Sequence, residues 1–414
     1  MILEKYSMGI GDRFAQQGNA QLNAFVEAAK IGINVTPIWN KSFREHQIIH
    51  SNPQDTRKEA NQAVKAVNWK KSYYVDADHI NLSNVDIFMD TSDFFTIDVA
   101  DYTGKNAEEK DIQEFAEKYK KYIGDLKIPG INEPFKVTRT LIEKIAEKYL
   151  LSVQEAGKIY RHIEQNKGLG NFVTEVSMDE TDLPQTPLEL FFILAGLANE
   201  NIPVQTIAPK FTGRFNKGVD YVGDLDQFEK EFNQDLAVIE FAIKNFGLPE
   251  NLKLSIHSGS DKFSIFGPIN KAIKKFNVGL HLKTAGTTWL EELIGLAEAD
   301  GEGLAIAKET YVSALARYQE LAEPYATVID IDKNELPTPE TIKGVGPKLF
   351  ADMLRHDLSH PDYNINFRQL LHVGYKVAAE MGEKYLGALK LYETSVARNV
   401  TENILKRHIE VVFG

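Results

Sequence analysis

The sequence predicts an α/β fold, a (β/α)8 TIM-type barrel with a helical insertion and a helical C-terminal extension. Short runs rich in β-branched and aromatic residues alternate with helical stretches along most of the chain. The runs, such as INVTPIW and LKLSIH, lack a clean alternation of polar and apolar residues, which is typical of strands covered on both faces. Three of the runs end in histidine, and the carboxyl ends of barrel strands gather at one face.

Eight strand-like runs each precede a helical stretch, as the repeating units of a barrel do. They cover residues 5–11, 33–39, 72–78, 94–100, 171–177, 202–208, 252–257 and 278–283. A ninth run, TVIDID at 327–332, has the same character. One of the nine is therefore expected to lie outside the barrel, and the pattern does not indicate which.

The helices between these strands carry recognisable start and stop signals. Thr186 and Glu189 form a capping box, with proline at the first helical position. Asp224 is expected to cap a long helix that ends at Gly247. A further capping box, Ser152 with Glu155, predicts a helix start within the segment that follows the fourth strand.

The domain organisation is predicted from the segments in which strands and helices cease to alternate. The barrel is expected to use residues 1–103 and 169–335, with residues 336–414 as a helical extension packed on it. Residues 104–168 are rich in lysine and glutamate and predict amphipathic helices inserted after the fourth strand. Such an insertion could form a lid over the active-site face, or could only add packing or an oligomer contact, so a homo-oligomer remains open.

Composition excludes several classes of function. The 414 residues carry a formal charge of −12, so the chain is expected to repel nucleic acid and anionic membranes. There is no cysteine, which excludes thiolate ligands and cysteine nucleophiles and fits a cytoplasmic protein. No secretory signal is expected, because no basic stretch leads into an apolar run near Met1, and no run is long enough to span a bilayer. GIGDRF at 9–14 lacks the last glycine of a dinucleotide-binding fingerprint.

His79, His257 and His281 end strand-like runs, and this placement predicts a divalent-metal site. A single histidine at a strand end is usually structural, but three on one rim favour metal binding. Neutral imidazole is a common ligand of zinc, iron, nickel, cobalt and manganese, and the sequence does not choose among these ions. Three protein ligands leave positions open for a substrate, which is the catalytic arrangement.

Other polar residues at the strand ends suggest acid/base and binding roles. Asp78 and Glu175 lie on different strands and are candidates for a catalytic acid/base pair. Glu175 could instead pair with a lysine or be a fourth metal ligand. The candidates for substrate binding, with rim salt bridges as the alternative, are Lys210, Ser258, Asp261 and Lys283.

Several segments together resemble the tagaturonate epimerases, metal-dependent enzymes of hexuronate catabolism, some of which also interconvert fructose and tagatose. The resemblance covers residues of about 70 to 410 and rests on YYVDADHINL, NFVTEVSMDETD, PKFTGRFNKGVDYVGD, SIHSGSDKFSIF and RHDLSHPDYNINFRQLLHVGYK. It implies a barrel and a divalent cation held by His79, His257 and His281. It also implies that Asp78 and Glu175 are the acid/base residues. The preference for a uronate or a neutral ketose is not fixed by these segments.

The reaction that this resemblance implies inverts a carbon β to the ketone, whose hydrogen is not acidic. Either hydride removal and return, or retro-aldol cleavage and re-addition, would achieve it. We expect retro-aldol chemistry, because the chain shows no nicotinamide fingerprint and a metal can act as a Lewis acid on the ketone. The alternatives are a metal-dependent ketose isomerase or aldolase on the same barrel, and a non-catalytic sugar-binding barrel. In each case the expected partner is a small sugar or sugar acid.

Overall fold

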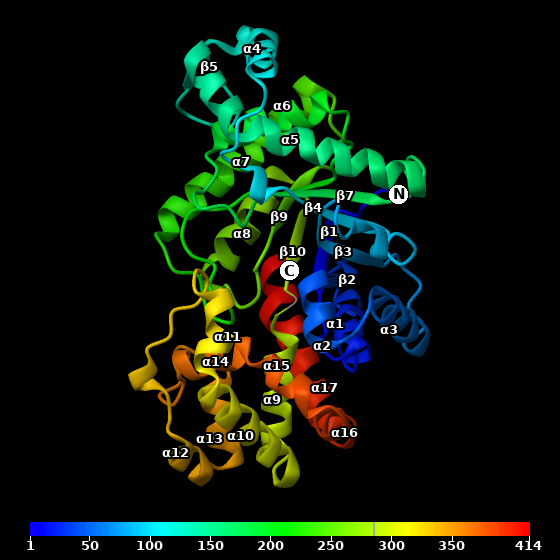
Figure 1. The fold of residues 1–414 in the computed structure, drawn as a ribbon, viewed down its shortest axis with the longest axis vertical. Coiled ribbons are helices and arrows are strands. Elements are labelled where there is room, and N and C mark those ends of the chain that lie inside the picture. The colour runs from blue at the N-terminus through cyan, green and yellow to red at the C-terminus, as the bar shows by residue number, and fades with distance from the viewer. Residues whose placement is uncertain (285) are drawn as a thin grey trace.

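The computed structural model describes residues 1–284 and 286–414 and contains a closed barrel of eight parallel strands (Figure 1). The strands are β1 (Tyr6–Ile10), β2 (Thr36–Ser42), β3 (Tyr74–Ile80), β4 (Phe94–Asp98), β7 (Val173–Ser177), β8 (Thr206–Ala208), β9 (Lys253–Ile256) and β10 (Leu280–Lys283). Their order around the barrel is β1-β10-β9-β8-β7-β4-β3-β2, and β1 closes the ring by pairing with both β10 and β2. The predicted fold class is confirmed, and the ninth run, 327–332, forms no strand.

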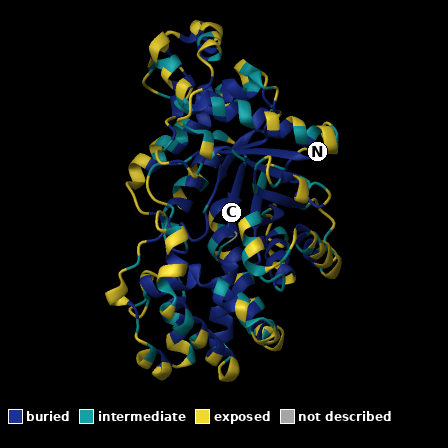
Figure 2. Cartoon of the chain, in the orientation of Figure 1, coloured by how far each residue is buried: buried dark blue, intermediate teal, exposed yellow. Residues whose placement is uncertain are grey.

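Seven helices pack around the strands and leave them buried in the centre of the molecule (Figure 2). They are α1 (Gly18–Lys30), α2 (Phe43–Ile49), α3 (Pro53–Ala66), α5 (Arg139–Lys167), α6 (Pro187–Asn199), α7 (Leu225–Phe246) and α8 (Phe263–Phe276). The capping box of Thr186 and Glu189 is confirmed, and so are the Asp224 cap and the end of α7 at Gly247, where φ is +68°. No helix in the described residues is long and apolar enough to cross a bilayer.

The segment 104–168 supplies α4 (Glu109–Lys118), the hairpin of β5 (Gly124–Leu126) and β6 (Phe135–Val137), and the long helix α5. It lies at the top of Figure 1, where α5 packs against α4 and α6. Helix α5 is thus the helix that connects β4 to β7. The start expected at Ser152 is wrong, because Ser152 is buried in the middle of α5 and packing continues the helix through it.

Residues 288–413 form a second helical region, most of which lies in the lower half of Figure 1. It contains α9 (Thr288–Glu298), α10 (Gly301–Ala316), α11 (Tyr318–Ala322), α12 (Pro339–Gly344), α13 (Pro347–Leu354), α14 (Ile365–Val373), α15 (Tyr375–Met381), α16 (Glu383–Leu391), α17 (Glu393–Glu402) and α18 (Glu410–Phe413). Helix α17 packs on α1 and α9, and α18 packs on α8, so the end of the chain returns to the barrel.

The interior of the barrel changes from apolar to charged along the strands. Its apolar cluster consists of Leu3, Ile38, Tyr74, Phe94 and Val173. Alternate residues of a strand point to the same face, so Asp76 and Asp78 follow Tyr74 on the inside, and Thr96 follows Phe94. Charged side chains therefore collect inside the barrel towards the carboxyl ends of the strands.

Candidate active site

A cavity of about 510 Å³ lies at the carboxyl ends of the strands. Residues at or beyond the ends of all eight strands line it: Arg13, Asn40, Asp78, Asp98, Asp179, Lys217, His257 and Lys283. Tyr325, His372 of α14 and Tyr375 of α15 also line it, so the C-terminal helical region forms part of its wall. No described residue of the segment 104–168 lines the cavity. The structure therefore gives no support to a lid formed by this segment.

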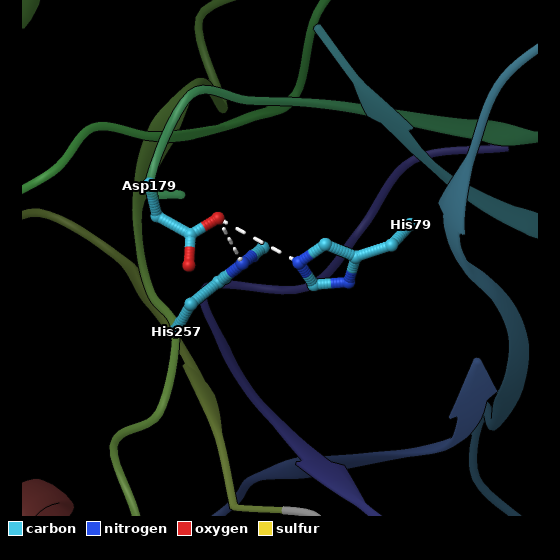
Figure 3. A group of neighbouring side chains, drawn as sticks. All are labelled: His79, Asp179 and His257. Carbon is cyan, nitrogen blue, oxygen red and sulfur yellow. Dashed lines mark ion pairs between the residues drawn. The ribbon is translucent and has the colours of Figure 1, made fainter. Parts of the chain in front are cut away.

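His79, Asp179 and His257 place three ligand atoms within 4.8 Å of one another at this cavity (Figure 3). Oδ1 of Asp179 lies 2.9 Å from Nδ1 of His257 and 3.6 Å from Nε2 of His79. Both nitrogens are buried, and within the described residues they form ion pairs with Asp179 but make no hydrogen bond of acceptable geometry. Two imidazole nitrogens that converge on one carboxylate oxygen form a set of donors suited to a metal ion.

The other ring nitrogen of each histidine contacts a carboxylate. Nδ1 of His79 lies 2.9 Å from Oδ1 of Asp78, and Nε2 of His257 lies 2.7 Å from Oε1 of Glu175. Metal-ligating histidines characteristically donate their second nitrogen to a carboxylate, which fixes the orientation of the ring. Asp78 and Glu175 therefore hold the two imidazoles with their remaining nitrogens towards Asp179.

The backbone of β3 contributes to this geometry. The register between β3 and β4 shifts between Ala77 and Ile80, and His79 has a φ of +54°. Such irregularities re-aim a side chain, and they are costly for a residue other than glycine. The bulge places His79 beside Asp78 on the cavity wall, where regular alternation along the strand would have pointed the two to opposite faces.

Lys283 lies at the centre of the buried carboxylates. Its Nζ is 2.8 Å from Asp76 and Asp78, 3.0 Å from Glu175 and 2.6 Å from Thr96 Oγ1. Burial opposes its charge, but the three carboxylates raise the pKa of Lys283 well above its usual value. Burial, despite Lys283, raises the pKa of Asp76 to about 7.

The electrostatics of this end of the cavity favour a cation. Burial disfavours a charged imidazole, yet Asp78 and Asp179 raise the pKa of His79 well above its usual value. Asp179 and Glu175 likewise raise the pKa of His257 to about 9, against burial and Lys283. Both shifts report a negative potential, which would favour a divalent ion held by His79, His257 and Asp179.

The comparisons with known proteins agree with the resemblance seen in the sequence. A family model described as UxaE, tagaturonate epimerase, matches residues 1–412. The chain belongs to this family. A relative from Thermotoga maritima, named tagaturonate/fructuronate epimerase, is 28% identical over 425 residues, covering 99% of this chain and 81% of the relative.

Solved structures of the fructuronate-tagaturonate epimerase UxaE from Cohnella laeviribosi have the same fold. A complex with one glycerol has a TM-score of 0.81 at 23% identity, covering 100% of this chain and 82% of that chain. The native structure has a TM-score of 0.79 at 23% identity, with the same coverage. At this identity the likeness shows the fold alone.

Of the three histidines expected to hold a metal in a tagaturonate epimerase, His79 and His257 lie together and His281 lies apart. His281 is completely buried and lies outside the ligand group of His79, Asp179 and His257. Its Nδ1 is 3.0 Å from Ser7 Oγ, and its ring packs on Phe94 with centroids 5.4 Å apart. Burial lowers the pKa of His281 to about 3. Asp179, and not His281, lies beside His79 and His257.

Of the expected acid/base pair, Asp78 lines the cavity and Glu175 does not. The carboxylate of Asp78 contacts His79 and Lys283 through Oδ1. Glu175 is fully buried and does not line the cavity, since His257, Lys283 and Thr96 surround Oε1. Asp98, at the end of β4, does line the cavity, and burial raises its pKa.

Two of the four expected substrate-binding residues lie away from the cavity. Lys210 donates from Nζ to the carbonyl of Thr181 and is not a lining residue. Asp261 is completely buried in an ion pair with Arg368, which turns its carboxylate away from the cavity. Ser258 and Lys283 do line the cavity.

Two residues that line the cavity, Lys217 and His372, have no role among the sequence-based predictions. Both fall within the segments that carried the family resemblance, PKFTGRFNKGVDYVGD and RHDLSHPDYNINFRQLLHVGYK. Neither follows a strand directly, so the strand-end rule could not find them. His372 reaches the cavity from α14, about 90 residues after the last strand.

Proposed function

We propose that this chain is a divalent-metal-dependent epimerase that interconverts D-tagaturonate and D-fructuronate by inverting C4. The observation that carries the proposal is the convergence of two buried imidazole nitrogens and the Asp179 carboxylate at the end of a polar cavity. Family membership and the names of the relatives from Thermotoga maritima and Cohnella laeviribosi support the substrate pair. When bound, the ion would supply Lewis acidity at the ketone oxygen of the sugar.

We favour cleavage and re-formation of the C3–C4 bond, because C4 is β to the ketone and its hydrogen is not acidic. Asp78 accepts the proton of the C4 hydroxyl as the bond breaks, using Oδ2, since Oδ1 is held by His79 and Lys283. The electron pair of the broken bond passes towards the ketone. The aldehyde then turns, and its other face re-forms the bond. Asp98 lines the cavity and is a better candidate than Glu175 for returning a proton to the inverted hydroxyl.

The function is tested by product analysis. Metal-loaded protein is incubated separately with tagaturonate and with fructose in deuterated water, and the products are identified by NMR. We expect fructuronate from tagaturonate, without deuterium at C4. Deuterium at C4 contradicts bond cleavage. An aldose or two shorter fragments would instead indicate an isomerase or aldolase, and saturable binding without conversion would indicate a sugar-binding barrel.

Glu175→Gln tests the orienting role that the structure gives this residue. The amide keeps the shape of Glu175 but removes the charge that fixes His257 and balances Lys283. We expect a folded protein whose metal affinity or turnover falls by about 10- to 100-fold, as for other partners of metal-binding histidines. Metal titration and steady-state kinetics measure the two effects. Wild-type values for both would show that Glu175 does not orient His257.

A further inference from the structure

The charges around the cavity are divided between two halves of the barrel. Strands β3, β4 and β7 are consecutive in the ring, and so are β8, β9, β10 and β1. The acidic lining residues at or after the first group are Asp78, Asp98, Asp101, Asp179 and Glu180. The second group is followed by the basic lining residues Arg13, Lys217 and Lys262, while Lys283 of β10 reaches across to the acidic half.

Neither Lys217 nor Lys262 forms an ion pair in the described residues. The Nζ of Lys262 is held by three backbone carbonyls, whereas that of Lys217 bonds to a serine hydroxyl. The backbone N–H of Lys217 donates to the carbonyl of Val328, and its Nζ donates to Ser258 Oγ at 3.2 Å. Ser258 directly follows the candidate ligand His257, so the ammonium lies on the cavity wall close to the metal end. Lys262 holds the loop that carries Lys217 through bonds to the carbonyls of Asn216 and Val219.

Arg13 is the second basic group and is only 8% exposed. Its guanidinium pairs with Glu45 and lies 4.3 Å from the centre of the Tyr375 ring. Its Nε is buried and has no hydrogen-bond partner among the described residues. A donor left unpaired at such a depth is costly unless a ligand or water satisfies it.

His372 completes this wall and is 5% exposed. A Cβ atom on Gly218 would lie 2.8 Å from its ring, and one on Gly286 would lie 2.6 Å, so two glycines make room for the imidazole. Burial holds the pKa of His372 well below its usual value, and nearby cations lower it further: Arg13, Lys217, Arg368 and Lys262. The neutral ring therefore lies in a region of positive potential.

We propose that the basic wall, defined as Arg13, Lys217 and His372, binds the carboxylate of a sugar-acid substrate and selects it over the neutral ketose. Glu45 offsets Arg13, and the ammonium of Lys217 supplies a positive charge that a substrate carboxylate can balance. The ketone end of the same substrate then lies towards His79, His257 and Asp179. This assignment rests on the proposed function, whose cavity it shares.

The test compares two substrates that differ only at C6, tagaturonate with a carboxylate and tagatose with a hydroxymethyl group. Lys217→Met removes the charge and keeps an unbranched side chain that is one atom shorter. We expect kcat/KM for tagaturonate to fall by about 10- to 150-fold, mainly through KM, because a charged hydrogen bond is lost. For tagatose kcat/KM should change by about twofold or less. Lys217→Arg should restore part of the preference.

The control is Lys244→Met, which removes an exposed lysine of α7 that pairs with Glu240. It should leave both substrates unaffected. Binding of tagaturonate and tagatose, measured by calorimetry, tests the carboxylate site separately from the proposed epimerase activity. Selective loss of tagaturonate binding in Lys217→Met supports the carboxylate site, even if the wild type turns over neither sugar. Equal effects on both sugars, or no effect on either, overturn the carboxylate site, whatever the wild type turns over.

Discussion

His257→Ala is expected to lose bound metal and epimerase activity together. The variant lacks the Nδ1 donor beside Asp179, and it also leaves Glu175 without its imidazole partner. Metal-ion catalysis supplies several kcal/mol of transition-state stabilisation, so turnover should fall by about 1,000-fold or more. Metal content of the purified protein, and activity across a titration of added metal, measure both losses.

His281→Asn is the matched control, because His281 also ends a barrel strand and was expected from sequence to be a ligand. The asparagine can keep a hydrogen bond to Ser7, and the ligand group of the structure does not include His281. We expect this variant to retain its metal. Asp179→Asn, by contrast, should weaken metal binding. If the folded His281→Asn protein loses metal while Asp179→Asn keeps it, the ligand set inferred from the structure is wrong.

The eight barrel strands were predictable because each is a short apolar run between helical patterns, and the strands pair with one another all around the ring. The run at 327–332 has the same sequence pattern, but its backbone groups bond to segments other than barrel strands. The carbonyl of Val328 accepts from the backbone of Lys217, while Asp330 N–H donates to Gln369 and Asp332 N–H donates to Asn366. Apolar pattern shows that a segment packs, but it does not show which groups satisfy its backbone.

The site was predictable as a region more than as a set of ligands. His281 and Lys283 are two residues apart on one strand and both point inwards, so His281 lies one layer deeper than the lysine that reaches the carboxylates. Sequence position at a strand end cannot resolve that depth. Asp179 reaches the site from the loop after β7, and the β3 bulge that re-aims His79 has no sequence signature comparable to a glycine.

Arg368→Met is expected to lower the free energy of unfolding by about 3–5 kcal/mol, because it leaves the fully buried carboxylate of Asp261 without its ionic partner. The arginine also donates to the carbonyls of Gly218 and Leu354. A fall in the urea midpoint, with the slope of the transition unchanged, would measure the loss. An unchanged midpoint would show that the buried pair contributes little.

The double variant Asp261→Asn with Arg368→Met distinguishes the cost of an unpaired charge from the loss of packing. If the charge dominates, the double variant should be more stable than Arg368→Met alone, because the buried site is then neutral. Asp261 lies four residues after His257, and Gly218 directly follows Lys217, so Arg368 joins the loops that carry both residues to α14. We therefore expect Arg368→Met to reduce metal affinity as well as stability, and the double variant to recover stability without recovering all of that affinity.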